Sequence, residues 1–210
     1  DDRSLAELGR WPWRRDLMAE IVDKLFRQYD VRALGFDMVF AESDQGAALT
    51  VLDELERGTL TNNPAVVEEI GRLRPQLDRD GRLAKAIQGR PVALGYFFSQ
   101  EPNGSQSGRL PRPAMKVTEF PGRFVARSSY GANLPRIQEA AAAVGHFNVD
   151  VDPDGVSRRV PLLLAYGDGL YESLALAMLR LIDGSDVVEL ERSRSGWLAG
   201  LKHRRVEALR

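Results

Sequence analysis

Residues 16–40, DLMAEIVDKLFRQYDVRALGFDMVF, hold the pattern that decides the fold class. Over residues 16–29 the apolar side chains recur every three or four positions with charged residues between them, which predicts an amphipathic helix. Residues 31–40 are almost continuously apolar, as expected for a strand that is covered on both faces. A helix followed by a buried strand is typical of α/β proteins.

The rest of the chain extends this alternation. The further predicted elements are helices over residues 47–56, 64–73, 78–88, 135–143 and 174–182, and strands over residues 91–98 and 187–190. Runs 144–151 and 158–166 flank a turn at residues 152–155 and predict a β-hairpin. Residues 99–116 have no periodicity and predict a mobile loop. We therefore expect one α/β domain over residues 1–210, with a mixed β-sheet flanked by helices on both faces and a hairpin in the C-terminal half.

Composition limits the classes of function. The 210 residues are 43% hydrophobic, which fits one folded domain. The 29 Lys+Arg residues balance 30 Asp+Glu, and a net charge of -1 argues against a general nucleic-acid binder. The absence of Cys excludes disulfides, thiolate metal sites and Cys nucleophiles. No apolar run approaches the roughly 20 residues of a membrane helix, and the start lacks both Met and a signal peptide, so we expect a piece of a longer protein.

The acidic run Asp150-x-Asp152-x-Asp154-Gly155 has the spacing that begins a calcium-binding EF-hand loop. The twelfth position of such a loop carries a bidentate carboxylate, but here it is Pro161, and strands replace the flanking helices. The favoured interpretation is a hairpin turn in which Asp side chains cap backbone amides and Gly155 has a positive φ. An ion site is the alternative.

Arg158 and Arg159 follow this turn. Adjacent strand residues point to opposite faces, so at most one of the two shares a face with a given acidic partner. One arginine has the geometry to bind a carboxylate or phosphate ligand in a bidentate manner. The alternative is that one pairs with the acidic turn while the other is solvated.

Three carboxylates, Asp37, Glu42 and Asp44, lie in and just after the first predicted strand. Ligands of open α/β sheets bind at such strand ends, so these residues give the sharpest enzyme hypothesis, a metal-dependent hydrolase. A nucleophile or base is not recognisable, and His146 is expected to be a satisfied core or edge residue. The structural alternative is that Asp37 pairs with Arg15 or Arg158.

The segment Trp11-Pro12-Trp13 precedes the first predicted helix, with Arg10 before it. Aromatic rings interleaved with arginine can stack on a ligand through cation–π contacts. The rings can also pack against the N-terminus of the helix, and this interpretation is favoured because Pro12 fixes the turn.

Four stretches of the chain together resemble one family. They are DDRSLAELGRWPWRRDLMAEIVDKL (1–25), VRALGFDMVFAESD (31–44), VGHFNVDVDPDGVSRRVPLLLAYGDGLYESLALAMLRL (144–181) and, more loosely, LAKAIQGRPVALGYFF (83–98). Their order and spacing are similar to those of the type-2 CHASE domain, the cyclase/histidine-kinase-associated sensory extracellular domain of bacterial membrane receptors. The resemblance covers about residues 1–98 and 130–190.

This resemblance implies a periplasmic or extracellular sensor domain of a multi-pass receptor in the bacterial inner membrane. The membrane helices would lie outside the chain, and the output would be a cytoplasmic nucleotide cyclase, such as an adenylate cyclase, or a kinase, such as a two-component histidine kinase. It implies no catalytic residue, metal or cofactor here, a small-molecule or protein signal, and a homodimeric receptor. A protein-interaction module without a small ligand is a third hypothesis. The expected sensing residues are Arg10, Trp11, Trp13, Asp37, Asp152, Asp154, Arg158 and Arg159.

Overall fold

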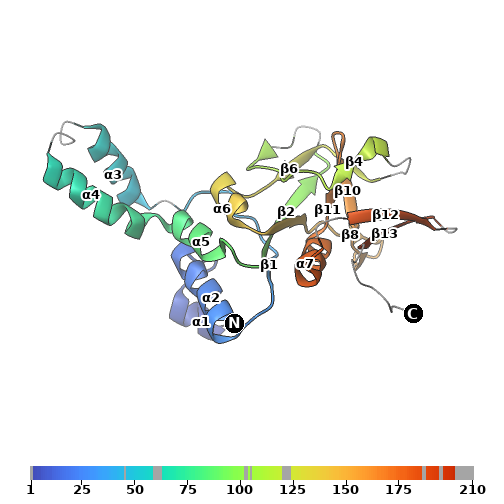
Figure 1. Ribbon diagram of the computed structural model, residues 1–210, viewed down its shortest axis with the longest axis horizontal. Helices are drawn as coiled ribbons and strands as arrows, with labels where there is room; N and C mark the ends of the chain where they lie inside the picture. The colour runs from blue at the N-terminus through green and yellow to red at the C-terminus, as the bar shows by residue number, and fades with distance from the viewer. Residues whose placement is uncertain are drawn as a thin grey trace. The chain divides into compact units, whose positions relative to one another are not determined.

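The computed structural model describes residues 2–44, 46–58, 63–101, 104, 106–119, 124–185, 188–193 and 196–201. These residues form two compact units (Figure 1). The first unit comprises residues 1–31 and 42–88, and the second comprises residues 32–41 and 89–210. Each unit is described by itself below, and the expectation of a single domain stays a prediction.

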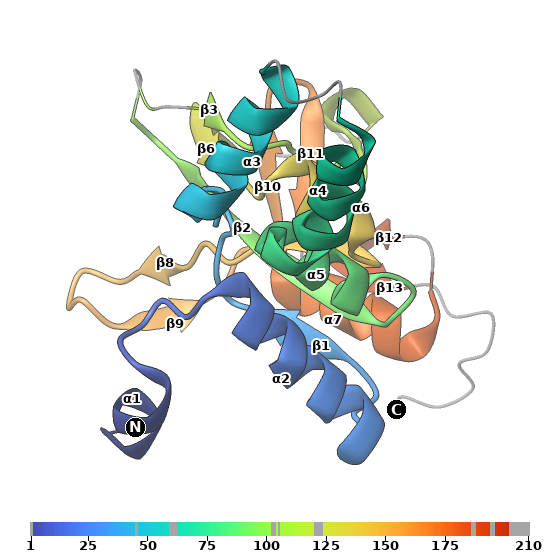
Figure 2. The same cartoon turned by 90° about the vertical axis from the view of Figure 1, so that its left-hand side faces the viewer.

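The first unit is helical. Its helices are α1 (Asp2–Leu8), α2 (Arg15–Gln28), α3 (Ala47–Arg57), α4 (Pro64–Leu77) and α5 (Arg79–Ile87). Helices α2 and α5 lie side by side in both views (Figures 1 and 2). The fully buried side chains of Val22, Leu83 and Ile87 belong to these two helices. Four of the five helices are those predicted from periodicity; α1 is additional, and none of its residues is buried.

Helices α3 and α4 pack through the buried side chains of Leu49, Leu52 and Ile70. Asn63 caps the N-terminus of α4, where its side chain accepts a 3.1 Å hydrogen bond from the Ala65 N–H. Pro64 occupies the first helical position, where its missing N–H costs no hydrogen bond. Local sequence therefore specifies this helix.

The second unit is built around β2 (Val92–Ser99). This strand runs parallel to β1 (Leu34–Phe36) and to β7 (Ala143–His146), and antiparallel to β6 (Ser129–Gly131). β3 (Gln106–Ser107) extends the sheet beyond β6. Helix α7 (Leu174–Asp183) packs on the strands through small residues of all three elements, Ala93, Ala143 and Ala177.

A second sheet has the order β4 (Met115–Lys116), β11 (Gly169–Glu172), β10 (Leu163–Tyr166) and β5 (Ala126–Arg127). Aromatic side chains form the contact between the two sheets: Tyr96 and Phe98 from β2 meet Tyr166 and Tyr171 from β10 and β11. The Phe98 and Tyr166 rings stack with their centroids 5.6 Å apart. This aromatic layer lies between the two sheets and forms part of the core of the second unit.

Smaller elements complete the second unit. They are α6 (Pro135–Ala140), the 3-10 turn Val117–Glu119, and the strand pairs β8 (Asp150–Val151) with β9 (Ser157–Arg159) and β12 (Val188–Ser193) with β13 (Gly196–Leu201). Figure 2 shows β8 and β9 as a ribbon that extends from the other strands of the unit.

The α/β class, the mixed sheets and a hairpin in the C-terminal half are confirmed, but three boundaries were predicted wrongly. The strand expected over residues 31–40 spans only β1, because the backbone of Phe40 bonds instead with Asn133 and Leu134. The single hairpin expected over 144–166 is divided among β7, β8–β9 and β10, and β10 pairs with β11. The segment 99–116 contains β3 and β4 and is therefore more than a loop.

Candidate functional site

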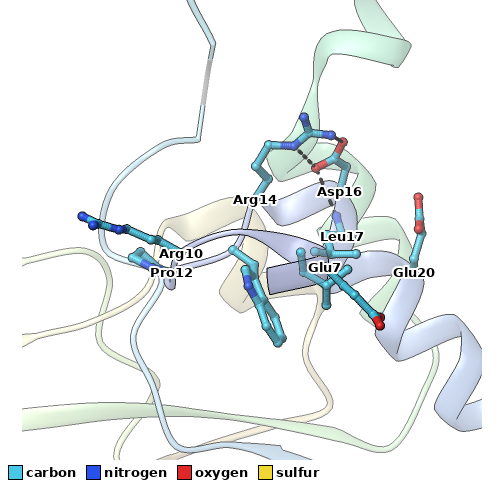
Figure 3. A pocket seen from close by; sticks show the side chains of 9 residues that line it. Glu7, Arg10, Pro12, Arg14, Asp16, Leu17 and Glu20 are labelled. Atoms are coloured by element: carbon cyan, nitrogen blue, oxygen red, sulfur yellow. Dashed lines mark hydrogen bonds and ion pairs between the residues drawn. The ribbon is translucent and has the colours of Figure 1, made fainter. Parts of the chain in front are cut away.

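A pocket of about 320 Å³ lies in the first unit between α1 and the beginning of α2 (Figure 3). Its lining residues are Glu7, Leu8, Arg10, Pro12, Trp13, Arg14, Asp16, Leu17 and Glu20. They come from α1, from the connecting loop and from one face of α2. The volume is at the lower end of the range for small-molecule sites, about 300–1,000 Å³.

The Trp-Pro-Trp loop forms one wall of this pocket. The Trp13 indole N–H donates a 3.1 Å hydrogen bond to the Gly9 carbonyl, which folds the loop back toward α1. Trp11 packs edge-on against Trp13 with ring centroids 5.3 Å apart, while 52% of Trp11 stays exposed. Trp13 is thus held in place by its own loop and lines the pocket, whereas Trp11 faces solvent.

Arg14 and Asp16 form an ion pair at the pocket. The Arg14 guanidinium donates to both carboxylate oxygens, at 3.0 and 2.6 Å, and the Leu17 N–H donates to the same carboxylate. Burial acts to raise the pKa of Asp16, but these hydrogen bonds outweigh it and leave the pKa below its ordinary value. The pair also lines a second cavity of about 220 Å³ bounded by residues of α3 to α5, so two cavities meet at one ionised pair.

The remaining charges of the pocket are of both signs. Arg10 is exposed, whereas Glu7 pairs with Arg3 at 3.0 Å and Glu20 lies 3.7 Å from Arg82. Figure 3 shows the Arg10 side chain directed away from Glu7 and Glu20, which lie at the other side of the pocket. Along the chain, the apolar side chains of Trp13 and Leu17 lie between Arg10 and Glu20. Such a pocket suits a small polar molecule that carries both an anionic and a cationic group.

Two acidic residues of the first unit, Asp44 and Asp80, make contacts that stabilise its structure. Asp44 accepts a 2.7 Å hydrogen bond from the Arg15 N–H at the start of α2 and pairs with Arg79 at 3.2 Å. Buried Asp80 accepts from the Ser43 hydroxyl at 2.5 Å and from the Asp44 N–H. These contacts join the residues after β1 to α2 and α5.

The alternative hypothesis of a metal-dependent hydrolase with Asp37, Glu42 and Asp44 finds no support in the residues that the structure describes. Asp37 is exposed directly after β1, not within a strand, and Asp44 is committed to Arg79 and the start of α2. Across the described part of the chain, no three His, Asp or Glu side chains are placed to hold a metal ion. Within the second unit, the alternative pairing of Asp37 with Arg158 is also not seen, because Arg158 pairs with Asp152 and Asp154; the alternative pairing with Arg15 stays a prediction.

The acidic hairpin turn closes on itself. Arg158 reaches Asp152 at 3.0 Å and Asp154 at 2.9 Å, and the Val156 N–H donates to Asp154. The hydrogen bond from Arg158 lowers the pKa of Asp154. Gly155 has φ = 81°, as its place in the turn requires. The structure thus has the turn rather than the ion site, with one arginine paired to the acidic residues; Arg159 is exposed on the opposite face, across from Asp150.

The sequence-predicted site residues therefore fall into separate places. Arg10, Trp11 and Trp13 belong to the pocket region of the first unit, and the other five belong to the second unit. The pocket residues missed from sequence are Glu7, Leu8, Arg14, Asp16, Leu17 and Glu20. Helical spacing from Trp13 gives Asp16, Leu17 and Glu20, so this signal was present.

Comparison with known proteins adds one match. A family model described as the CHASE2 domain matches residues 1–206. No curated protein and no solved structure matches the chain. None of the helices within the described residues has the length and apolar character needed to cross a lipid bilayer.

Proposed function

Because the chain belongs to the CHASE2 domain family, whose members are extracytoplasmic and themselves non-catalytic sensor domains of signalling receptors, we propose that it is the signal-input domain of a bacterial transmembrane receptor. The receptor is a multi-pass protein of the inner membrane and acts as a homodimer. Its cytoplasmic output is a nucleotide cyclase or a kinase.

The pocket between α1 and α2 is the observation that supports a small molecule as the signal. It combines a fixed aromatic wall, an exposed guanidinium and two carboxylates in about 320 Å³. The ligand class that matches these groups is a small zwitterion such as an amino acid. Its carboxylate binds Arg10, and its apolar part packs on Trp13. Its ammonium group binds Glu7 or Glu20 in place of the exposed side chain of Arg3 or of Arg82.

The position of α1 provides a way to relay binding. No residue of α1 is buried, so few apolar contacts fix this helix in the absence of ligand. A ligand that touches Glu7 on α1 and Glu20 on α2 favours the arrangement in which the two helices are held together. The difference in ligand affinity between the two arrangements sets how far the equilibrium shifts.

The other predicted residues have different roles in this proposal. Arg158 pairs with both Asp152 and Asp154, and these ion pairs stabilise the hairpin turn. Trp11, Asp37 and Arg159 are exposed and remain accessible to a protein partner.

The test is a thermal-shift screen of the chain against amino acids, organic acids, small amines, nucleotides and divalent cations. A ligand at 100 times its Kd stabilises the folded state by about 2.7 kcal/mol. The Arg10→Ala variant should lose the shift, and the matched Arg158→Ala variant should keep it. A shift lost only in Arg158→Ala moves the site to the hairpin turn, and no shift with any compound rejects a small-molecule signal.

A further inference from the structure

His146 ends β7 at a junction of three elements. It is directly opposite Tyr96 on β2, and it forms an isolated bridge with Ser173, where β11 ends and α7 begins. The imidazole is fully buried in the aromatic layer between the two sheets, with its ring centroid 6.5 Å from that of Tyr96 and 6.1 Å from that of Phe98. A polar, titratable ring thus occupies a place where a core normally has an apolar side chain.

Within the described part of the chain, the ring makes no hydrogen bond of normal geometry, and its polar neighbour is the Tyr171 backbone. Both Nδ1 and Nε2 are buried and unpaired, and the Tyr96 hydroxyl in the same layer is unpaired as well. Most buried polar groups in native proteins have a partner, and an exception calls for an explanation. The prediction that His146 is a core residue is confirmed, whereas its expected hydrogen bonding is limited to the weak contact with the Tyr171 backbone.

The surroundings of His146 disfavour a positive charge. The titratable and charged groups that face it or lie in the packed elements are Tyr96 on β2, Arg127 on β5, Tyr166 on β10, and Tyr171 and Glu172 on β11. Glu172 is already bound by Arg180 of α7, whose Nε donates at 2.8 Å. The charge that acts on the imidazole is therefore that of Arg127, which is positive.

Burial and the positive charge of Arg127 both favour the neutral form of the His146 ring. Burial, followed by the repulsion from Arg127, lowers the pKa of His146 from 6.5 to about 4, and the nearby Tyr171 backbone opposes this only in part. At neutral pH the ring is neutral and the packing is intact.

The backbone contact at this junction is close. A Cβ added at Gly145 would lie 2.5 Å from the Leu174 nitrogen, so the end of β7 touches the start of α7 directly. A protonated imidazole that moves out to water must break this contact and the bridge to Ser173. The junction of β7 with the β11–α7 corner is therefore the element that responds to the ring.

We propose that acid is a signal for this domain: protonation of His146 releases β7 from the β11–α7 corner. The inference rests on the proposed function as a signal-input domain, and it adds the proton as an input that is independent of the pocket. An extracytoplasmic domain is in contact with the medium outside the cytoplasm, so its protonation follows the pH there.

The first measurement is an NMR titration of the folded chain, which contains two His residues, His146 and His203. We expect the His146 signals to titrate near pH 4, and the Arg127→Gln variant to shift this midpoint to higher pH. A midpoint near 6.5 for His146 overturns the proposal. This test needs no His146 variant and so does not depend on the folding of one.

The second measurement is urea unfolding between pH 7.5 and 4. A group that is protonated in the unfolded but not the folded state raises the unfolding constant by up to tenfold per pH unit in the window between its two pKa values, here about 6.5 to 4. We expect this slope in the wild type and in the matched His203→Gln variant, and a reduced slope in His146→Gln. An unchanged slope in His146→Gln overturns the proposal.

The third measurement is amide hydrogen exchange at pH 7 and pH 5. Protection factors should fall first in β7 and at residues 173–174, and stay high in the Val22–Leu83 region of the first unit. A uniform fall across both units overturns a local release. Since the ligand screen concerns the first unit alone, a failed screen combined with these results rejects the pocket and keeps the acid response.

Discussion

The side chain of Asn133 accepts a 2.8 Å hydrogen bond from the buried N–H of Phe40, 93 residues away in sequence. Its amide group also donates a 3.0 Å hydrogen bond to the Gly95 carbonyl. One fully buried side chain thus connects the segment after β1, strand β2 and the residues before α6. This contact ends β1 and holds the middle of the second unit together.

Replacing Asn133 with Ala should therefore be costly. It leaves two buried backbone groups without a partner, and we expect a loss of about 2–4 kcal/mol in the free energy of unfolding. Asn148 is the matched control, because it makes the same pair of contacts with Phe98 but is only half-buried. Urea unfolding of Asn148→Ala should show about 1 kcal/mol, and equal losses in the two variants would contradict this account.

Gly145 should tolerate no side chain. The added methyl group of Gly145→Ala meets the backbone of Ser173 and Leu174, which cannot move as a side chain can. We expect a loss of about 1–3 kcal/mol, measured by thermal or urea unfolding. Gly71 is the control: it lies within α4 with open space around it, so Gly71→Ala should stabilise the chain by about 0.5–1 kcal/mol. A harmless Gly145→Ala would refute the close approach of β7 to α7.

Breaking the Glu172–Arg180 pair should destabilise the second unit. Arg180→Met leaves the buried Glu172 carboxylate without its guanidinium, and we expect a cost of about 2–4 kcal/mol. The pair Arg109–Glu139, with both side chains more than 60% exposed, is the comparison. Arg109→Met should change the free energy of unfolding by about 1 kcal/mol or less. If the two substitutions have equal effects, burial is not what makes the Glu172 pair important.

The stabilisation provided by the Arg14–Asp16 pair should be lost in acid, below about pH 4. Since the folded-state pKa of Asp16 is depressed, its contribution is complete above the ordinary Asp value and is lost as pH falls through the folded-state pKa. Arg14 is 63% exposed and its ion pair is screened by solvent, so Arg14→Ala should change the stability at pH 7 only slightly. Its stability should then decline less than that of the wild type between pH 4 and pH 2.5. A parallel decline would show that Arg14 does not hold the carboxylate ionised.

The elements that could be predicted from sequence are those that local patterns decide. Helix α2 follows from its apolar spacing, and α4 from Asn63 and Pro64. The end of β1 could not be predicted, because it depends on Asn133, which is distant in sequence. The division of residues 144–166 among three sheets likewise depends on which strands β7 and β10 meet.

The residues of the candidate site divide in the same way into those that local sequence predicts and those that it does not. Arg10 and Trp13 could be selected because aromatic and arginine residues are adjacent in sequence. The presence of Glu7 and Glu20 in one pocket depends on how the Trp13 indole bonds to Gly9. The unpaired state of His146 depends on strands β2, β5 and β11, and no local signal marks it.

The β8–β9 ribbon has a consequence for aggregation. Within the described residues these strands pair only with each other, so the outer edge of each has free backbone groups. Exposed aliphatic side chains lie along the same ribbon, at Val149, Val151, Val156, Val160 and Leu162. Such an edge is a template for strand addition by another chain, and charged residues on an edge oppose it. Asp150, Arg158 and Arg159 provide those charges, so replacing both arginines with Val or Thr should turn the ribbon into a nucleus for fibrillar assembly.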